Sequence, residues 1–147
     1  MKIDPKSIRN QFPALRRDAV FLDGPAGSQV PQSVIDAISG YYVNHNANHG
    51  GAFATSRESD AVVDEARRAC ADLLGTSDDG CISFGANMTT ITFALSRAIA
   101  TTWKPGDEVI VTRLDHDANV SPWVRAAQDR GATVRHLEIH PEDCTLT

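Results

Sequence analysis

The second half of the chain alternates short β-type segments with helical ones, and this alternation constrains the fold more than any other feature. Strands are expected at 81–84, 108–112 and 133–139, with helices between them at 88–102 and 121–131. Strands separated by helices at this spacing are typical of βαβ units. We therefore predict an α/β fold with a mainly parallel sheet and flanking helices.

The first half of the chain is expected to be mostly helical. Residues 19–22 predict one short strand, and Pro31 is placed to open a helix. A second helix follows a long polar loop, with Thr55 and Glu58 at the spacing of a capping box and Gly75 at the expected stop.

The length of 147 residues corresponds to one domain. We interpret residues 1–20 as an N-terminal arm and residues 21–147 as the N-terminal part of a large domain, truncated at Thr147. A parallel sheet with helices over only part of its surface leaves apolar faces open, which favours a partial domain. A complete small three-layer domain is the alternative.

Composition limits the classes of partner. The chain has 41% hydrophobic and 22% charged residues and a formal charge of -5, which argues against nucleic-acid and membrane partners. The N-terminal residues lack an apolar signal core, so a cytoplasmic location is expected. The three cysteines Cys70, Cys81 and Cys144 match neither a disulfide framework nor a metal site.

A glycine-containing turn lies between the first strand of the alternating region and its helix. The turn reads Gly85-Ala86-Asn87-Met88. Backbone N–H groups at a helix start are unpaired, and the helix dipole favours an anion there, so a phosphate would fit. The alternative is that Asn87 is a plain helix cap.

A histidine follows the next strand. His116 lies between Asp115 and Asp117, directly after the expected strand 108–112. Ligands of open α/β sheets gather at the carboxyl ends of strands, where an imidazole can stack on a flat ring or move a proton. The alternative is a histidine held by its acidic neighbours, one of which caps the next helix.

A third candidate lies in the polar loop before the second helix. His49 and Gly50 are part of a long segment without regular structure, and such loops are often functional. The alternative is a flexible surface connection.

Four stretches, taken in order, resemble one family. They read FLDGPAGSQVPQSVIDAI, ANHGGAFATSRESDAVVDEARR, ISFGANMTTITFALSRAI and PGDEVIVTRLDHDANVSPWVRAAQDRGATVRHLEI. This order resembles the front part of cysteine desulfurases and selenocysteine lyases, within the class V aminotransferases. The resemblance runs from about Phe21 to Ile139.

The resemblance implies a type I fold that depends on pyridoxal 5'-phosphate (PLP), of which this chain would hold part of the large domain. It implies a homodimer acting on a small amino acid, by C–S bond cleavage or transamination. It assigns the phosphate turn to Gly85, Ala86, Asn87 and Met88, ring stacking and proton transfer to His116, and the substrate entrance to Ala26, Gly27, His49 and Gly50.

Two departures qualify the resemblance. The phosphate turn has Ala86 and Asn87 where the family usually has two threonines, and Asp117 replaces a second histidine. The family's Schiff-base lysine and catalytic cysteine are expected beyond Thr147, and the chain's lysines are Lys2, Lys6 and Lys104. The chain alone is therefore expected to be inactive, and a non-catalytic phosphate- or nucleotide-binding module is the alternative function.

Overall fold

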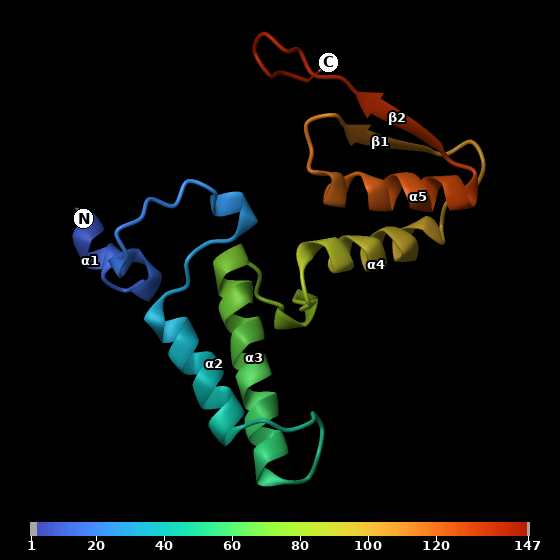
Figure 1. Ribbon diagram of the computed structural model, residues 1–147. Coiled ribbons are helices and arrows are strands. Elements are labelled where there is room, and N and C mark those ends of the chain that lie inside the picture. The colour runs from blue at the N-terminus through green and yellow to red at the C-terminus, as the bar shows by residue number, and fades with distance from the viewer. Residues whose placement is uncertain (1–2, 147) are drawn as a thin grey trace. The chain divides into compact units, whose positions relative to one another are not determined.

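The computed structural model describes residues 3–146. Its contacts divide the chain into two compact units, Met1–Ile82 and Ser83–Thr147, each of which is described by itself. Figure 1 shows the first unit as helical and the second as a small sheet with helices.

The first unit is built on two long helices. α2 (Gln32–Asn44) follows Pro31, and α3 (Ala54–Leu74) ends at Gly75, whose φ of 74° gives the left-handed stop that the sequence predicted. The shorter elements are α1 (Pro5–Arg9), η1 (Pro13–Arg16), η2 (Gly24–Ala26) and η3 (Asp79–Cys81).

Two predictions for this unit are wrong. Residues 19–22 form no strand, since no other described segment pairs with them and a lone strand leaves its backbone groups unpaired. The capping box at Thr55 and Glu58 does not form either. α3 begins earlier, at Ala54, without a side-chain cap, and Glu58 instead pairs with His45.

The second unit contains the predicted βαβ arrangement. β1 (Glu108–Thr112) and β2 (Thr133–Leu137) are parallel and in register from the pair Glu108–Thr133 to the pair Thr112–Leu137. α5 (Ser121–Arg130) connects them and contacts both strands. α4 (Met88–Ala100) packs on α5, and the short turn η4 (Asp117–Asn119) precedes α5. The parallel sheet and both of its predicted helices are confirmed.

The strand predicted at 81–84 is wrong. Cys81 ends η3, and Ile82 is extended (φ -90°, ψ 119°) without joining a ladder. Among residues 3–146, the regular sheet consists of β1 and β2, so this segment has no neighbour with which to pair.

Small side chains mediate the packing of α4. The buried residues of this helix are Thr92, Ser96 and Ala100, one on each turn, while α5 buries Pro122, Ala126 and Ala127. The two hydroxyls bond backbone carbonyls of their own helix, so they are buried without loss of partners. The apolar stripe predicted on α4, Ile91, Leu95 and Ile99, stays 41–49% exposed.

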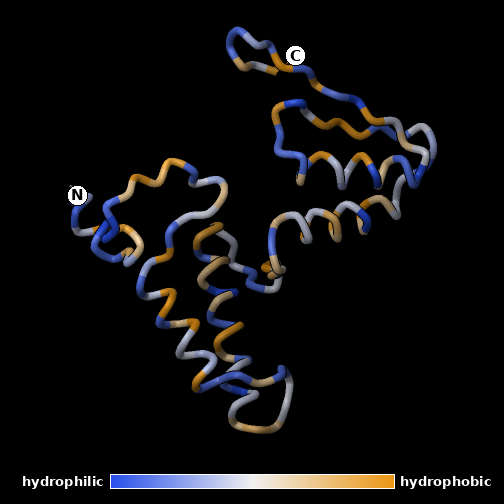
Figure 2. Tube along the Cα trace, viewed as in Figure 1, coloured by the Kyte–Doolittle hydropathy of each residue, from blue (hydrophilic) through white to orange (hydrophobic). Residues whose placement is uncertain are grey.

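The sheet also carries apolar surface that the described residues leave uncovered. Figure 2 shows β1 as a hydrophobic run, yet Ile110 at its centre is 64% exposed. Uncovered apolar faces on sheet and helix are what a partial fold of this type presents. Within residues 3–146, no helix combines the length and apolar character needed to cross a membrane.

Candidate functional site

The turn before α4 is both a helix cap and a potential anion site. Asn87 is extended (φ -168°, ψ 168°), and its Oδ1 accepts a hydrogen bond of 2.9 Å from the N–H of Thr90. The backbone N–H groups of Met88 and Thr89 donate to no atom of the described chain and lie at the surface. The side chain of Asn87 therefore caps the helix while two N–H groups stay available to an anion.

Packing of α4 also explains the glycine in this turn. A Cβ atom on Gly85 would lie 2.4 Å from Cγ1 of Ile91, one turn into the helix. Any other residue would displace the Ile91 side chain. Gly85 is thus required where the turn meets its own helix, a reason that the sequence pattern alone did not reveal.

His116 is fixed by the backbone that follows it. It precedes η4 in an extended conformation (φ -61°, ψ 141°), and its Nδ1 accepts a 3.1 Å hydrogen bond from the N–H of Ala118. In the neutral imidazole the proton is then on Nε2. The side chain is exposed, so this N–H is free to donate to a ligand.

The acidic neighbours of His116 have other partners. Asp115 accepts hydrogen bonds from the hydroxyl of Thr112 (2.5 Å) and the amide of Asn119 (3.3 Å), and Asp117 accepts one from Ser121 (2.6 Å). The bonds from Thr112 and Asn119 lower the pKa of Asp115. In the described structure neither carboxylate bonds the imidazole, so the interpretation of His116 as held by its acidic neighbours is wrong.

The turn and the histidine loop lie at one end of the second unit. α4 contacts η4, and Figure 1 shows α4 beginning on the side where β1 ends and α5 begins. α4 has 13 residues and therefore spans about 20 Å. Lys104 follows the opposite end of this helix, away from the turn, as expected from the sequence.

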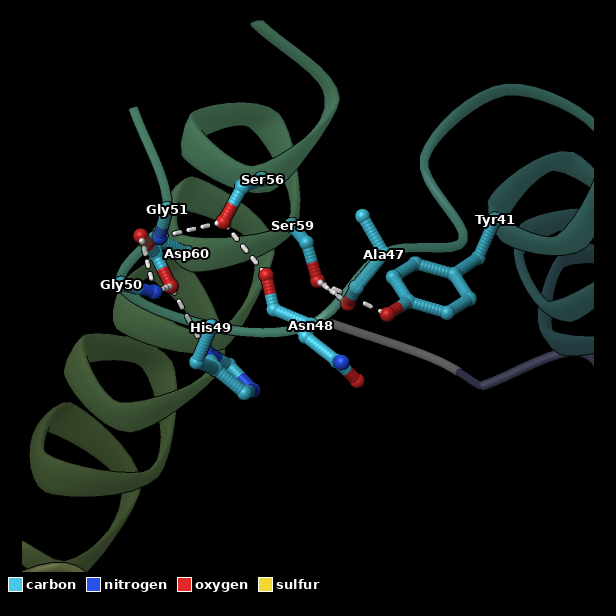
Figure 3. Close-up of polar contacts among 9 residues, drawn as sticks. All are labelled: Tyr41, Ala47, Asn48, His49, Gly50, Gly51, Ser56, Ser59 and Asp60. Carbon is cyan, nitrogen blue, oxygen red and sulfur yellow. Dashed lines mark hydrogen bonds and ion pairs between the residues drawn. The ribbon is translucent and has the colours of Figure 1, made fainter. Parts of the chain in front are cut away.

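The loop before α3 is held by that helix (Figure 3). Nδ1 of His49 lies 2.7 Å from Oδ1 of Asp60, and the N–H of Gly50 lies 3.2 Å from each oxygen of the same carboxylate. Gly50 has a φ of +74°, a conformation that favours glycine. One carboxylate on α3 thus holds both predicted entrance residues of this loop.

Two serines complete the attachment. Ser56 accepts a 2.8 Å hydrogen bond from the N–H of Gly51 and donates to the carbonyl of Asn48. Ser59 donates to the carbonyl of Ala47 at 3.2 Å, and its hydroxyl lies 2.8 Å from that of Tyr41. Both serines are buried, so the interpretation of this loop as a flexible connection is wrong.

Sequence reasoning missed these anchoring residues, although a signal was present. Ser56, Ser59 and Asp60 stand at positions i, i+3 and i+4 of one helix and therefore share a face. Three small polar residues on one face, directly after a polar loop, are suited to bond that loop.

The remaining entrance residues lie elsewhere in the first unit. Ala26 ends η2 and Gly27 follows it, with the Gly27 N–H bonded to the carbonyl of Gly24 at 3.2 Å. Figure 1 places η2 by the opposite end of the α2–α3 pair from the loop that carries His49. The turn at 85–88, which precedes α4, and His116, which precedes η4, thus belong to elements that meet at one end of the second unit, whereas η2 and the loop that carries His49 lie toward opposite ends of the α2–α3 pair.

Comparison with known proteins identifies the family. The family model "Aminotransferase class-V" matches residues 20–145. An uncharacterised protein from Mycobacterium tuberculosis is 38% identical over 97% of this chain, and a probable cysteine desulfurase from Vibrio cholerae is 36% identical over 91%. In each case the match covers 35% of the relative, so the chain spans about a third of their length.

Solved structures agree with this. A cysteine desulfurase from Thermococcus onnurineus superposes with a TM-score of 0.84 at 26% identity, over 94% of this chain and 34% of that one. The cysteine desulfurase CsdA of Escherichia coli gives 0.80 at 31% identity, over 96% and 36%. The fold is thus part of the type I fold of PLP-dependent enzymes. The chain belongs to the class V aminotransferase family, whose cofactor is pyridoxal phosphate.

Proposed function

We propose that this chain supplies the phosphate-holding turn and the ring-stacking histidine of a PLP-dependent enzyme that acts on a small amino acid. The reaction of the whole enzyme is C–S bond cleavage, as in the cysteine desulfurases, or transamination. One observation carries the proposal. The unpaired N–H groups at the start of α4 and the loop of His116 lie at the same end of one unit.

The residues present fit the phosphate group of PLP. The N–H groups of Met88 and Thr89 point out of a helix start, where the dipole favours negative charge. The cap uses only the oxygen of the Asn87 amide, so its NH₂ group is a further donor. Ala86 brings little side-chain bulk to the approach.

PLP, when bound, withdraws electrons from the α-carbon of an amino-acid substrate. The chain's own residues would bind the cofactor and orient it. The turn would hold the phosphate, and His116, whose Nδ1 is fixed by the Ala118 N–H, would stack on the ring. The neutral imidazole presents Nε2–H, from which it would donate a hydrogen bond.

Turnover requires a Schiff-base lysine, which the family resemblance places outside the described residues. Lys6 is in the first unit, and Lys104 lies beyond the far end of α4. Lys2 lies outside the described residues. We expect the 147-residue chain to bind PLP weakly and without a covalent bond, and to show no turnover.

The entrance residues favour a homodimer. η2, which ends at Ala26, and the loop that carries His49 lie toward opposite ends of α2, whose 13 residues span about 20 Å. A small amino acid is far shorter than that and would not contact both within one chain. A site shared by two copies resolves this, with Ala26 and Gly27 serving one site and His49 and Gly50 the other.

The proposal also includes two expectations from the sequence, namely a domain boundary after residue 20 and a cytoplasmic location.

Ligand titration followed by amide NMR tests the proposal. PLP is expected to shift the amide signals of residues 85–89 and the ring signals of His116, whereas pyridoxal, which lacks the phosphate, is expected to shift them much less. Inorganic phosphate should move the turn but not the imidazole. Stronger shifts with ATP or NAD would replace the PLP site with a nucleotide-binding module.

A charge variant sharpens this test. Asn87→Asp keeps a good cap for α4 but adds a negative charge beside the phosphate, so PLP binding should weaken while the helix is retained. Gln11→Glu adds the same charge at an exposed position of the first unit and should leave binding unchanged. Equal binding by wild type and Asn87→Asp would contradict a phosphate at this turn.

A further inference from the structure

The imidazole of His49 is held by a residue of α3, not by its own loop. Its Nδ1 lies 2.7 Å from Oδ1 of Asp60, eleven positions further along the chain. The carboxylate is one-third exposed, while the imidazole is 60% exposed. One edge of the ring is thus bonded to the helix and much of the rest is accessible.

The partners of Asp60 determine which nitrogen carries the proton. An ionised carboxylate only accepts hydrogen bonds. The Gly50 N–H, which can only donate, approaches both carboxylate oxygens at 3.2 Å, as expected for the ionised group. Nδ1 of His49 must therefore donate its bond to Asp60. In the neutral imidazole, Nε2 then carries a lone pair in place of a proton.

This arrangement is the opposite of that at His116. There Nδ1 accepts from the Ala118 N–H, so the neutral ring carries its proton on Nε2. Of these two histidines, His116 thus offers a hydrogen-bond donor and His49 an acceptor.

We propose that Asp60 is a positioning residue that fixes His49 in the Nδ1–H tautomer, so that the entrance loop presents the Nε2 lone pair to a donor group of an amino-acid substrate. The role of His49 at the substrate entrance rests on the function proposed above. The tautomer itself does not, because it follows from contacts within the first unit.

The surrounding bonds favour a defined orientation over a chance contact. The two residues after His49 are also bonded to α3, Gly50 through Asp60 and Gly51 through Ser56. Asp60 therefore acts on a loop whose backbone is already fixed, and a small change at its carboxylate should appear at the imidazole.

Long-range ¹H–¹⁵N correlation spectra of the histidine rings, recorded on the 147-residue chain without PLP at a pH where the rings are neutral, test the proposal. Wild-type His49 is expected to show its proton on Nδ1. In Asp60→Ala the proton should move mainly to Nε2, the form that predominates in free histidine. The Gly50 amide should then exchange faster with solvent.

A matched control uses the other histidine–carboxylate pair of this region. His45 Nδ1 lies 3.3 Å from Glu58, also on α3, so Glu58→Ala removes a similar contact and should leave the His49 spectrum unchanged. Asp60→Asn keeps the side-chain shape but has one acceptor oxygen for two donors, and should show both tautomers. This variant decides the question if Asp60→Ala unfolds.

Two results overturn the proposal. One is a wild-type His49 with its proton on Nε2, and the other is a Glu58→Ala variant that changes His49 as much as Asp60→Ala does. Failure of PLP to bind would instead count against the proposed function and would leave the tautomer result standing.

Discussion

The loop that carries His49 and the loop that carries His116 are both ordered, but by contacts of different range. The first is held by Ser56, Ser59 and Asp60, which lie 5 to 12 residues from the loop groups that they bond. The second is held by Thr112 and by the Ala118 N–H, over two or three residues. Loops of similar polarity are therefore fixed either by a neighbouring helix or by their own short turns.

The largest expected difference is between two helix serines, Ser59 of α3 and Ser121 of α5, each of which bonds one of the two loops. Ser59→Ala leaves the Ala47 carbonyl and the Tyr41 hydroxyl without their buried partner and should reduce the free energy of unfolding by about 1–3 kcal/mol. Ser121→Ala removes a single bond to Asp117 nearer the surface and should cost about 0.5–1 kcal/mol. Urea denaturation checks both, and equal losses would remove the distinction between the loops.

A glycine pair tests whether the first loop needs its backbone conformation. Gly50→Ala forces a side chain into a positive φ and should destabilise the chain by about 1–2 kcal/mol. Gly40→Ala lies in the interior of α2 with open space around it and should stabilise by about 0.5–1 kcal/mol. A thermal melt showing no loss for Gly50→Ala would mean that the loop adapts readily.

The start of α4 tests how much a short-range contact contributes to stability. Asn87→Ala removes the bond to the Thr90 N–H and should cost about 1 kcal/mol. Thr89→Ala, at a neighbouring position whose hydroxyl bonds nothing in the described chain, should change stability by less than about 0.5 kcal/mol. Equal effects in urea titrations would show that the cap contributes nothing specific.

The smallest effect concerns the pKa of Asp115. Thr112→Val removes the hydroxyl that bonds this carboxylate, so the pKa of Asp115 should rise toward its ordinary value. Because the folded-state pKa of Asp115 is lowered, its ionised form stabilises the fold at neutral pH, and this contribution is lost as the pH falls through that pKa.

Carboxyl ¹³C titration measures this change. Asp143, whose pKa is lowered by its own bonds to Thr145, is the internal control and should not respond to Thr112→Val. An Asp115 pKa that is the same in both proteins would show that Thr112 does not orient the carboxylate.

The range of the contacts also explains what the sequence could predict. The helix stop at Gly75, the cap at Asn87 and the parallel strands around α5 depend on local propensity and period, and they were predicted. The segments 19–22 and 81–84 have strand composition, but strands need a partner that no local pattern supplies. The bond between His49 and Asp60 was not predicted for the same reason, because the loop and α3 must first fold against each other.

Gly85 changes how a glycine-containing turn of this kind should be interpreted. The space beside Gly85 is filled by the Ile91 side chain of the helix that follows and is not left open for a ligand. A distant relative that no longer bound the cofactor would still require glycine at this position, because the packing of the turn on its helix would be the same. Glycine here is therefore evidence of how the turn folds onto its helix, and evidence of ligand binding must come from the exposed amides beside it.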